Sequence, residues 1–295
     1  MSKDYVIVVD STTDISPQMA KELGVEVIPL IFRVDDKEYL NYLDYRDLSV
    51  KDFYDALRSG KTASTAQNTV YKYMEAWEPF LKEGKDILYM CLSSALSKSY
   101  DQSVLASREA MEEYPERKVI TIDTKSASLG QGLLAYYASQ AKEEGKTIDE
   151  NAEYLESLIT RLNHWIVPDD LHHLRRGGRV SGASAFVGTM LSIKPILTIL
   201  DSGSLVPAAK VRGWAKAEEY IAERMTEQGV DEDTIIFIAH SDIQEKADKT
   251  AENIKEKYGV KKFVINNIGP VIGAHTGPGT VAVIFLGKNR PKINA

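Results

Sequence analysis

The sequence has a single cysteine, Cys91, so no disulfide can form within the chain. A chain without disulfides is typical of a reducing compartment, and we expect a cytoplasmic protein. No apolar run approaches the ~18 residues needed to cross a bilayer, and the apolar stretch near the N-terminus is too short for a signal peptide. The 5 histidines form no His-Glu-x-x-His pattern, which argues against a zinc site.

Basic residues are fewer than acidic ones. Lysine and arginine number 36 against 43 aspartates and glutamates, and the net charge of −7 argues against a protein that binds nucleic acid. The chain has no Gly-x-x-x-x-Gly-Lys-Ser/Thr motif, so we expect no productive ATP binding by this chain alone. What is present is a hydrophobic fraction of 43% in 295 residues, enough for a sizeable core in two domains or one large α/β unit.

Strand, polar loop and helix alternate through the first half of the chain. Buried strands are predicted at residues 5–9, 86–92 and 118–122, each followed by a hydroxyl-rich loop and a helix. This alternation predicts a parallel sheet with helices on both faces and with the polar loops at one edge. Residues 25–45 are predicted to form a small hairpin excursion. We assign residues 1–164 to this N-terminal α/β domain.

The pattern changes near Trp165, and residues 165–295 are predicted to form a second α/β domain with a mixed sheet. A helix over 149–163 is expected just before the change, and a hairpin over 195–210 is expected after it. The further helices are predicted at 183–192, 214–228 and 243–258, and the further strands at 234–239, 262–265 and 281–286. The expected fold class is therefore α/β with two domains.

Residues 269–280 are the most unusual stretch, reading Gly-Pro-Val-Ile-Gly-Ala-His-Thr-Gly-Pro-Gly-Thr. Proline removes backbone donors and glycine opens conformations with positive φ, so we expect a loop here and not a regular helix. The backbone N–H groups of such a loop, with the side chains of His275 and Thr276, would approach an anion or a carbonyl. The alternative is a tight turn that serves packing alone.

Three loops carry hydroxyl groups, around Ser11, Ser64-Thr65 and Ser93-Ser94, and the predicted fold brings them to one sheet edge. Neutral hydroxyls and backbone amides in a dry cleft can bind a carboxylate without the ion pair that would lower its reactivity. For each loop taken singly, helix N-capping is the alternative.

A second interpretation makes Ser93 a nucleophile and His275 its base. The sequence offers no Gly-x-Ser-x-Gly elbow and no acid placed to orient the histidine, both of which count against this hydrolase interpretation.

Residues 175–179, together with Lys210 and Arg212, form a local basic cluster in an acidic chain. This cluster is either a solvated turn or a docking surface for a phosphate or an acidic partner. The apolar run at residues 186–191 is either domain core or the lining of a tunnel. The tunnel is the alternative because glycine has no side chain and methionine is flexible.

Together these segments resemble the DegV family, over nearly the whole chain. The basic turn and the glycine-rich stretch, in that order and spacing, are the most specific part of the resemblance. The motifs that carry it are Asp10-Ser11, Ser64-Thr65-Ala66-Gln67, Leu92-Ser93-Ser94-Ala95-Leu96-Ser97, Leu174-Arg175-Arg176-Gly177-Gly178-Arg179-Val180-Ser181, Lys194-Pro195-Ile196-Leu197 and residues 269–280.

The resemblance implies a two-domain α/β protein that binds a long-chain fatty acid in a buried apolar pocket. It implies a lipid-binding carrier, not an enzyme, with no cofactor. Such a carrier would present the carboxylate of its fatty acid to a separate ATP-binding subunit of a fatty acid kinase, which forms the acyl phosphate. Transient membrane contact fits this role, and nucleic acid is not an expected partner.

The resemblance also assigns the site. Thr65 and Ser93 would contact the carboxylate, with His275 beside it. The residues that complete the carboxylate site would be Ser64, Ser94, Gly273 and Ala274. The residues at the pocket mouth, where the partner approaches, would be Arg176 and Arg212.

Two positions depart from the pattern of the family. Asn68 stands where proline is common, and Lys98 stands where glycine is common. The alternatives to a carrier are a stand-alone acyl hydrolase or transferase that uses Ser93, and a lipid sensor without a kinase.

Overall fold

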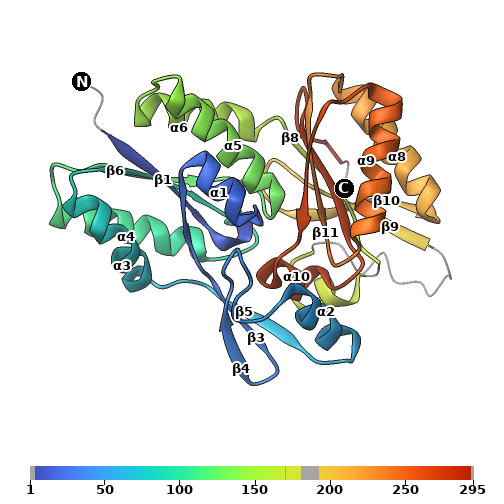
Figure 1. Ribbon diagram of the computed structural model, residues 1–295, viewed down its shortest axis with the longest axis horizontal. Coiled ribbons are helices and arrows are strands. Elements are labelled where there is room, and N and C mark those ends of the chain that lie inside the picture. The colour runs from blue at the N-terminus through green and yellow to red at the C-terminus, as the bar shows by residue number, and fades with distance from the viewer. Residues whose placement is uncertain (1–3, 170, 181–192, 294–295) are drawn as a thin grey trace.

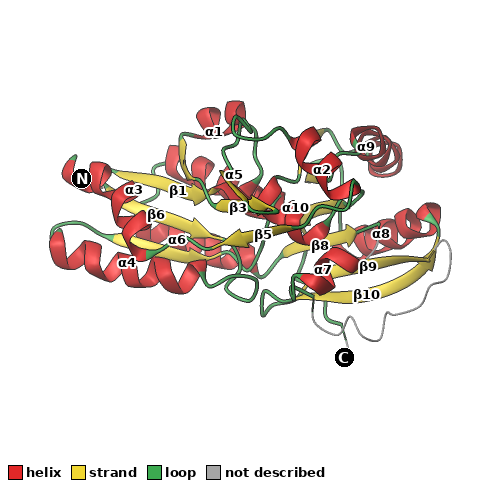
Figure 2. Cartoon of the chain, turned by 90° about the horizontal axis from the view of Figure 1, so that it is seen from below, coloured by secondary structure: helices red, strands yellow, loops and turns green. Residues whose placement is uncertain are grey.

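The computed structural model describes residues 4–169, 171–180 and 193–293, and it contains two large β-sheets with helices packed on them (Figure 1). The strands form a central band, with α4 (Ser99–Glu113) on one side of it and α1 (Pro17–Leu23) and α5 (Leu129–Glu143) on the other (Figure 2). This is the α/β class predicted from the sequence.

The first sheet has the strand order β2-β1-β6-β7, and every neighbouring pair is parallel. Side chains of β1 alternate between its faces, so Ile7 and Val9 pack with α5 while Val6 and Val8 pack in the core that holds Trp77 of α3 (Val70–Lys82). Helices therefore cover both faces, as predicted. The strands are β1 (Tyr5–Asp10), β2 (Val25–Ile28), β6 (Asp86–Cys91) and β7 (Val119–Asp123).

Local sequence sets the ends of helix α1. The hydroxyl of Ser16 accepts a hydrogen bond from the backbone N–H of Met19, Pro17 occupies the first turn, and Gly24 ends the helix at φ 60°. The other helical segments of this half are η1 (Ser11–Thr13), α2 (Val50–Arg58) and α6 (Ile148–Ile159).

A small antiparallel sheet of order β4-β3-β5 stands beside the first one. Its hairpin of β3 (Ile31–Val34) and β4 (Lys37–Leu40) lies within the predicted excursion over 25–45, whereas residues 25–28 form β2 of the parallel sheet instead. The third strand, β5 (Ala63–Ala66), carries Ser64 and Thr65, which the sequence had placed in a loop at the edge of the parallel sheet, so that prediction is wrong. Ala-Ser-Thr-Ala has little apolar character, and the segment becomes a strand by pairing with β3.

The second sheet has the order β10-β9-β8-β13-β11-β12. Its neighbours are antiparallel except for the parallel pair of β11 and β12, which confirms the predicted mixed sheet. Helices α8 (Trp214–Gln228) and α9 (Gln244–Tyr258) pack on its outer face (Figure 1). The strands are β8 (Leu162–Val167), β9 (Ile193–Ile199), β10 (Leu205–Arg212), β11 (Ile235–His240), β12 (Lys262–Asn267) and β13 (Val281–Leu286).

Strand β8 was missed, and the helix predicted over 149–163 ends earlier, at Ile159 of α6. Asn163 and His164 are buried polar residues inside β8, and they break the apolar run that would have marked a strand. All six residues of β8 pair with β13, so the predicted domain boundary at 164/165 falls within a strand of the second sheet. One hydrophobic cluster joins both sheets through α5, and the division into two domains stays a prediction.

The glycine-rich stretch contains helix α10 (Pro270–Thr276), so the predicted loop is wrong. Pro270 sits in the first turn of α10, where a backbone N–H has no intrahelical acceptor, so the proline removes no hydrogen bond. Gly277, at φ 72°, ends the helix. A Cβ on Gly273 would lie 2.5 Å from the Oη of Tyr54, so glycine is what lets α10 pack closely on α2.

The basic turn also contains a short helix, α7 (His172–Arg176). The helix predicted over 183–192, the apolar run at 186–191 and Ser181 lie outside the described residues. None of the described helices is long and apolar enough to cross a bilayer.

Candidate functional site

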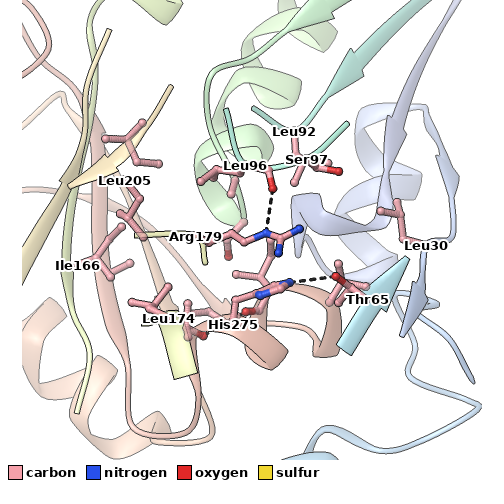
Figure 3. Close-up of a pocket in the computed structure, with 18 of the residues that line it drawn as sticks. Leu30, Thr65, Leu92, Leu96, Ser97, Ile166, Leu174, Arg179, Leu205 and His275 are labelled. Carbon is pink, nitrogen blue, oxygen red and sulfur yellow. Dashed lines mark hydrogen bonds between the residues drawn. The ribbon is translucent and has the colours of Figure 1, made fainter. Parts of the chain in front are cut away.

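A cavity of about 430 Å³ lies between the two large sheets, beside the small sheet and α10. Its walls are mostly apolar, with Leu30 on one side and Ile166 and Leu205 on the other (Figure 3). The apolar residues that line it are Leu30, Ala66, Leu92, Leu96, Ala127, Ile166, Leu174, Ile199, Leu205, Ile268, Val271, Ile272, Ala282 and Ile284. A cavity of this volume and lining suits a small, largely apolar ligand.

Thr65 and His275 meet at the cavity wall, although 210 positions separate them in the chain. The Oγ1 of Thr65 lies 2.9 Å from the Nε2 of His275 (Figure 3). Thr65 is opposite the buried Phe32 in the register of β5 with β3, and His275 belongs to the last turn of α10. Two elements that the sequence had not predicted, β5 and α10, therefore bring this pair together.

His275 is held in its neutral form. Burial, together with the nearby cations Arg179 and Arg176, lowers its pKa to about 4. The Nδ1 of His275 is buried without a hydrogen-bond partner, and an unpaired N–H there would cost more than an unpaired lone pair. The proton therefore belongs on Nε2, which donates to Thr65 and leaves the threonine hydroxyl free to donate to an acceptor in the cavity.

Arg179 crosses the cavity beside this pair (Figure 3). Its Nε donates to the main-chain oxygen of Leu96 at 3.2 Å, which links the segment after α7 to the loop after β6. The sequence had drawn attention to the basic turn but had singled out Arg176 within it. The signal that favours Arg179 is its place directly after Gly178, whose φ of 67° turns the chain at the end of α7.

Ser93 lies outside the cavity lining and is fully buried. Its Oγ donates to the main-chain oxygen of Gly203, at 2.9 Å, in the turn between β9 and β10. Ser94 is held by Asp123, to which its Oγ donates at 2.6 Å, and Ser64 is exposed on the face of β5 opposite to Thr65. Of the hydroxyl groups predicted at Ser64, Thr65, Ser93 and Ser94, the structure thus brings only that of Thr65 to the cavity wall.

Gly273 and Ala274 are buried in α10 without lining the cavity. Gly273 packs against Tyr54, and Ala274 belongs to the core that also holds Phe53. Their place in the structure is to hold α10, and so His275, against α2.

The two arginines predicted at the mouth are exposed. Arg176 ends α7, two residues after the cavity-lining Leu174, and its Nη2 lies 3.1 Å from the Nδ1 of His173. Arg212 ends β10 and does not line the cavity.

Thr276, whose side chain was predicted to approach a ligand, lines the cavity, whereas sequence reasoning missed four other polar residues of its wall: Gln67, Ser97, Ser128 and His164. His164 is the least expected of them, because its Nε2 lies 2.7 Å from the Oγ of Ser126 inside the apolar core. Burial holds the pKa of His164 well below its usual range, so the ring is neutral. The polar pair Asn163-His164 in an otherwise apolar segment was the available signal.

Both departures from the family pattern are accommodated. Asn68 is buried and its Nδ2 donates to the main-chain oxygen of Pro29 at 3.3 Å. Lys98 lines the cavity at the start of α4, where its cation pairs with Asp101 at 3.2 Å and so offsets the unfavourable helix dipole.

The pairing that a serine hydrolase would need is not formed. Ser93 donates to Gly203, and His275 contacts Thr65. A nucleophile and its base must lie within hydrogen-bond reach of each other, so this arrangement gives the hydrolase interpretation no support.

Comparison with known proteins gives a consistent result. The model of the family "Uncharacterised protein, DegV family" matches residues 4–288. A DegV domain-containing protein of Clostridium perfringens is 43% identical over 289 residues, which is 98% of this chain and 99% of that protein.

Two solved structures show the same fold. A DegV family protein from Thermus thermophilus, described by its fatty acid binding, has a TM-score of 0.86 and 27% identity, covering 97% of this chain and 100% of that one. A DegV family protein from Ruminococcus gnavus, solved with vaccenic acid, has a TM-score of 0.84 and 26% identity, covering 95% of this chain and 99% of that one.

Proposed function

Because this chain belongs to the DegV family, we propose that it binds a long-chain fatty acid in the cavity between its two large sheets. The observation that carries the proposal is an apolar cavity of about 430 Å³ with one hydroxyl–imidazole pair, Thr65 and His275, on its wall. A solved relative with vaccenic acid and another described by fatty acid binding support the ligand class.

The apolar tail should dominate affinity. Each buried methylene contributes ~0.8 kcal/mol, so a chain of roughly sixteen carbons contributes about 10 kcal/mol before the costs of ordering it. A hydrogen bond to a charged acceptor adds about 1.5–3 kcal/mol. The tail therefore sets retention, and Thr65 with its neutral partner His275 sets the position of the carboxylate.

The direct test is the mass of whatever accompanies the purified protein. Denaturing mass spectrometry of the wild-type protein should release one or a few long-chain fatty acids. A protein that carries none, and takes up none on incubation with palmitate or oleate, would reject the proposal.

Thr65 provides a sharper prediction. Thr65→Val keeps the shape of the side chain but removes the donor, so the affinity for palmitate should fall roughly tenfold to a hundredfold. Thr276→Val is the matched control, because Thr276 also lines the cavity but turns its hydroxyl toward the main-chain oxygen of Ile272. Equal affinities for the Thr65 variant and the wild type, measured by calorimetry, would remove Thr65 from the head-group site.

We propose further that the protein is a carrier which presents the carboxylate to an ATP-dependent kinase subunit, with Arg176 and Arg212 as docking residues. Support comes from the exposure of both arginines and from the position of α7, whose Leu174 lines the cavity. Exposed charges govern encounter with a partner more than they govern a buried ligand.

This part of the proposal predicts that binding and phosphorylation can be separated. Arg176→Glu or Arg212→Glu should leave retention of palmitate within about twofold of the wild type, yet reduce acyl-phosphate formation with added kinase subunit by at least about tenfold. Arg46→Glu, at a side chain that is 63% exposed in the loop before α2, is the control. If the charge reversals empty the cavity instead, these arginines are ligand contacts.

A further inference from the structure

A buried carboxyl group connects the start of α10 to the wall of the cavity. Asp14 follows η1 and is 1% exposed. Its Oδ1 accepts a hydrogen bond from the backbone N–H of Gly269 at 3.0 Å, and its Oδ2 accepts one from the Oγ of Ser128 at 2.6 Å. Gly269 is the N-cap of α10, and Ser128 lines the cavity just before α5.

The backbone at this junction is built to bring these groups close together. Asp14 adopts φ 51° and Ser128 adopts φ 55°, both in the left-handed region, and a Cβ on Gly269 would lie 2.6 Å from the Oδ1 of Asp14. The main-chain oxygen of Asp14 also accepts a hydrogen bond from the Nδ2 of Asn266 at 2.8 Å, at the end of β12. Asp14 therefore touches elements of both large sheets at once.

The surroundings of Asp14 fit a protonated acid better than a carboxylate. The Nδ2 of Asn41 donates to the main-chain oxygen and to the Oγ of Ser11, at 3.2 and 3.1 Å, which fixes the orientation of the amide. The Oδ1 of Asn41 is then buried without a hydrogen-bond partner. It lies 3.3 Å from the position that a Cβ on Gly269 would occupy, which is also the position that the Oδ1 of Asp14 approaches. Asp14 and Asn41 therefore bring two acceptor oxygens to the same position beside Gly269, and an acid proton there would give the oxygen of Asn41 a donor.

The charges around Asp14 agree with this. Burial raises the pKa of Asp14 to about 8, although the hydrogen bonds from Ser128 and Gly269 lower it, and no cation among the described residues acts on it. The titratable groups that face it are Asp10, Tyr45 and Tyr54, and burial raises the pKa of each. Both phenols therefore stay neutral at and above neutral pH, and His275, with its pKa near 4, titrates well below this range.

We propose that Asp14 is a positioning residue which, as a neutral acid, ties the start of α10 to the cavity wall at Ser128. The inference rests on the proposed function, because α10 carries His275 of the head-group site at its other end. Ionisation of Asp14 would place a negative charge between Ser128 and the start of α10, where no cation among the described residues acts on it. We therefore expect α10 to loosen and the ligand to dissociate faster.

Asp14→Asn is the decisive variant, because an amide keeps the shape of the side chain and still accepts the N–H of Gly269 through its oxygen, but cannot ionise. Urea unfolding of the wild type and of this variant should be compared between about pH 5 and about pH 9. The folded-state pKa of Asp14 is above its ordinary value of 3.8, so the wild type is at its most stable at low pH and loses stability as pH rises toward 8. The ratio of the two unfolding constants should grow up to about tenfold per pH unit over that window and level off above it.

The second measurement is the release of cis-parinaric acid, an intrinsically fluorescent long-chain fatty acid. Its dissociation rate should rise several-fold in the wild type as pH passes through about 8 and should stay constant in Asp14→Asn. Asp14→Ala, which removes both hydrogen bonds, should release it fast at every pH, and if this variant does not fold, the asparagine comparison still decides.

The outcomes separate the two proposals. An unfolding ratio independent of pH overturns the neutral acid, and equal pH profiles of release in the wild type and Asp14→Asn overturn the positioning role. A wild type that takes up no cis-parinaric acid at all overturns the proposed function and the positioning role with it, whereas the unfolding comparison still tests the protonation of Asp14.

Discussion

Replacing Ala282 with tryptophan should lower the affinity for a long-chain fatty acid by more than about a hundredfold. Ala282 lies on β13, 5% exposed, and faces the cavity beside Ile284. An indole at this position would take space from a cavity of about 430 Å³ and displace part of the tail. Displacing roughly four methylenes removes about 3 kcal/mol, which is more than a hundredfold in affinity.

The same strand offers the control. Val283 is fully buried on the opposite face of β13, in the core beneath α8 and α9. Val283→Phe should destabilise the fold by about 1–3 kcal/mol through overpacking and leave the affinity for palmitate unchanged. Calorimetric titration and urea unfolding of both variants separate a filled cavity from a weakened fold. A folded Ala282→Trp protein with wild-type affinity would place the ligand elsewhere.

The sequence predicted the fold where local patterns and tertiary structure agree. The parallel strands, the hairpin of β3 and β4 and the long helices follow from apolar periodicity and capping residues such as Ser16 and Ser49. The predictions failed where pairing or packing overrides local preference. Strand β5 forms by pairing with β3, and α10 forms in spite of its glycines because Gly273 packs on Tyr54.

The candidate site was predictable in part for the same reason. Thr65 and His275 were both named from the resemblance, but the contact between them depends on β5 and α10, which are set by tertiary packing. Arg179 and His164 could not be placed, because which side chain of a basic turn or of a buried strand reaches a cavity depends on how the two sheets meet. Residue types were therefore easier to foresee than their partners.

The two halves of the chain are joined by hydrogen bonds as well as by apolar packing, and the guanidinium of Arg290 makes four of these bonds. It lies beyond residues 4–288 matched by the family model and is 1% exposed. The four hydrogen bonds of its guanidinium go to main-chain oxygens, those of Ile159 at 2.6 Å, Lys125 at 2.8 Å, Leu200 at 3.0 Å and Thr124 at 3.4 Å. Burial lowers its pKa to about 10, so the side chain remains a cation at neutral pH.

These oxygens come from three segments: the end of α6, the loop after β7, and the turn between β9 and β10. The same turn contains Gly203, which accepts the hydrogen bond of Ser93, and is flanked by Ile199 and Leu205 of the cavity wall. Arg290 thus fixes one wall of the cavity from behind without touching it.

Arg290→Met should destabilise the protein by about 3–5 kcal/mol, because a methionine of similar length fills the space but leaves buried carbonyl oxygens without donors. Urea unfolding at neutral pH measures the loss. Because the turn between β9 and β10 also loses its anchor, the variant should bind palmitate more weakly even under conditions in which it is fully folded.

Arg290→Lys is the matched control for charge. Lysine keeps the cation, but its single ammonium cannot reach oxygens on three segments with the planar geometry of a guanidinium, so it should recover only part of the lost stability. Full recovery by lysine would mean that charge alone matters at this position. An unfolding midpoint of Arg290→Met equal to that of the wild type would show that other donors replace the guanidinium at these four oxygens, and that Arg290 does not hold the cavity wall.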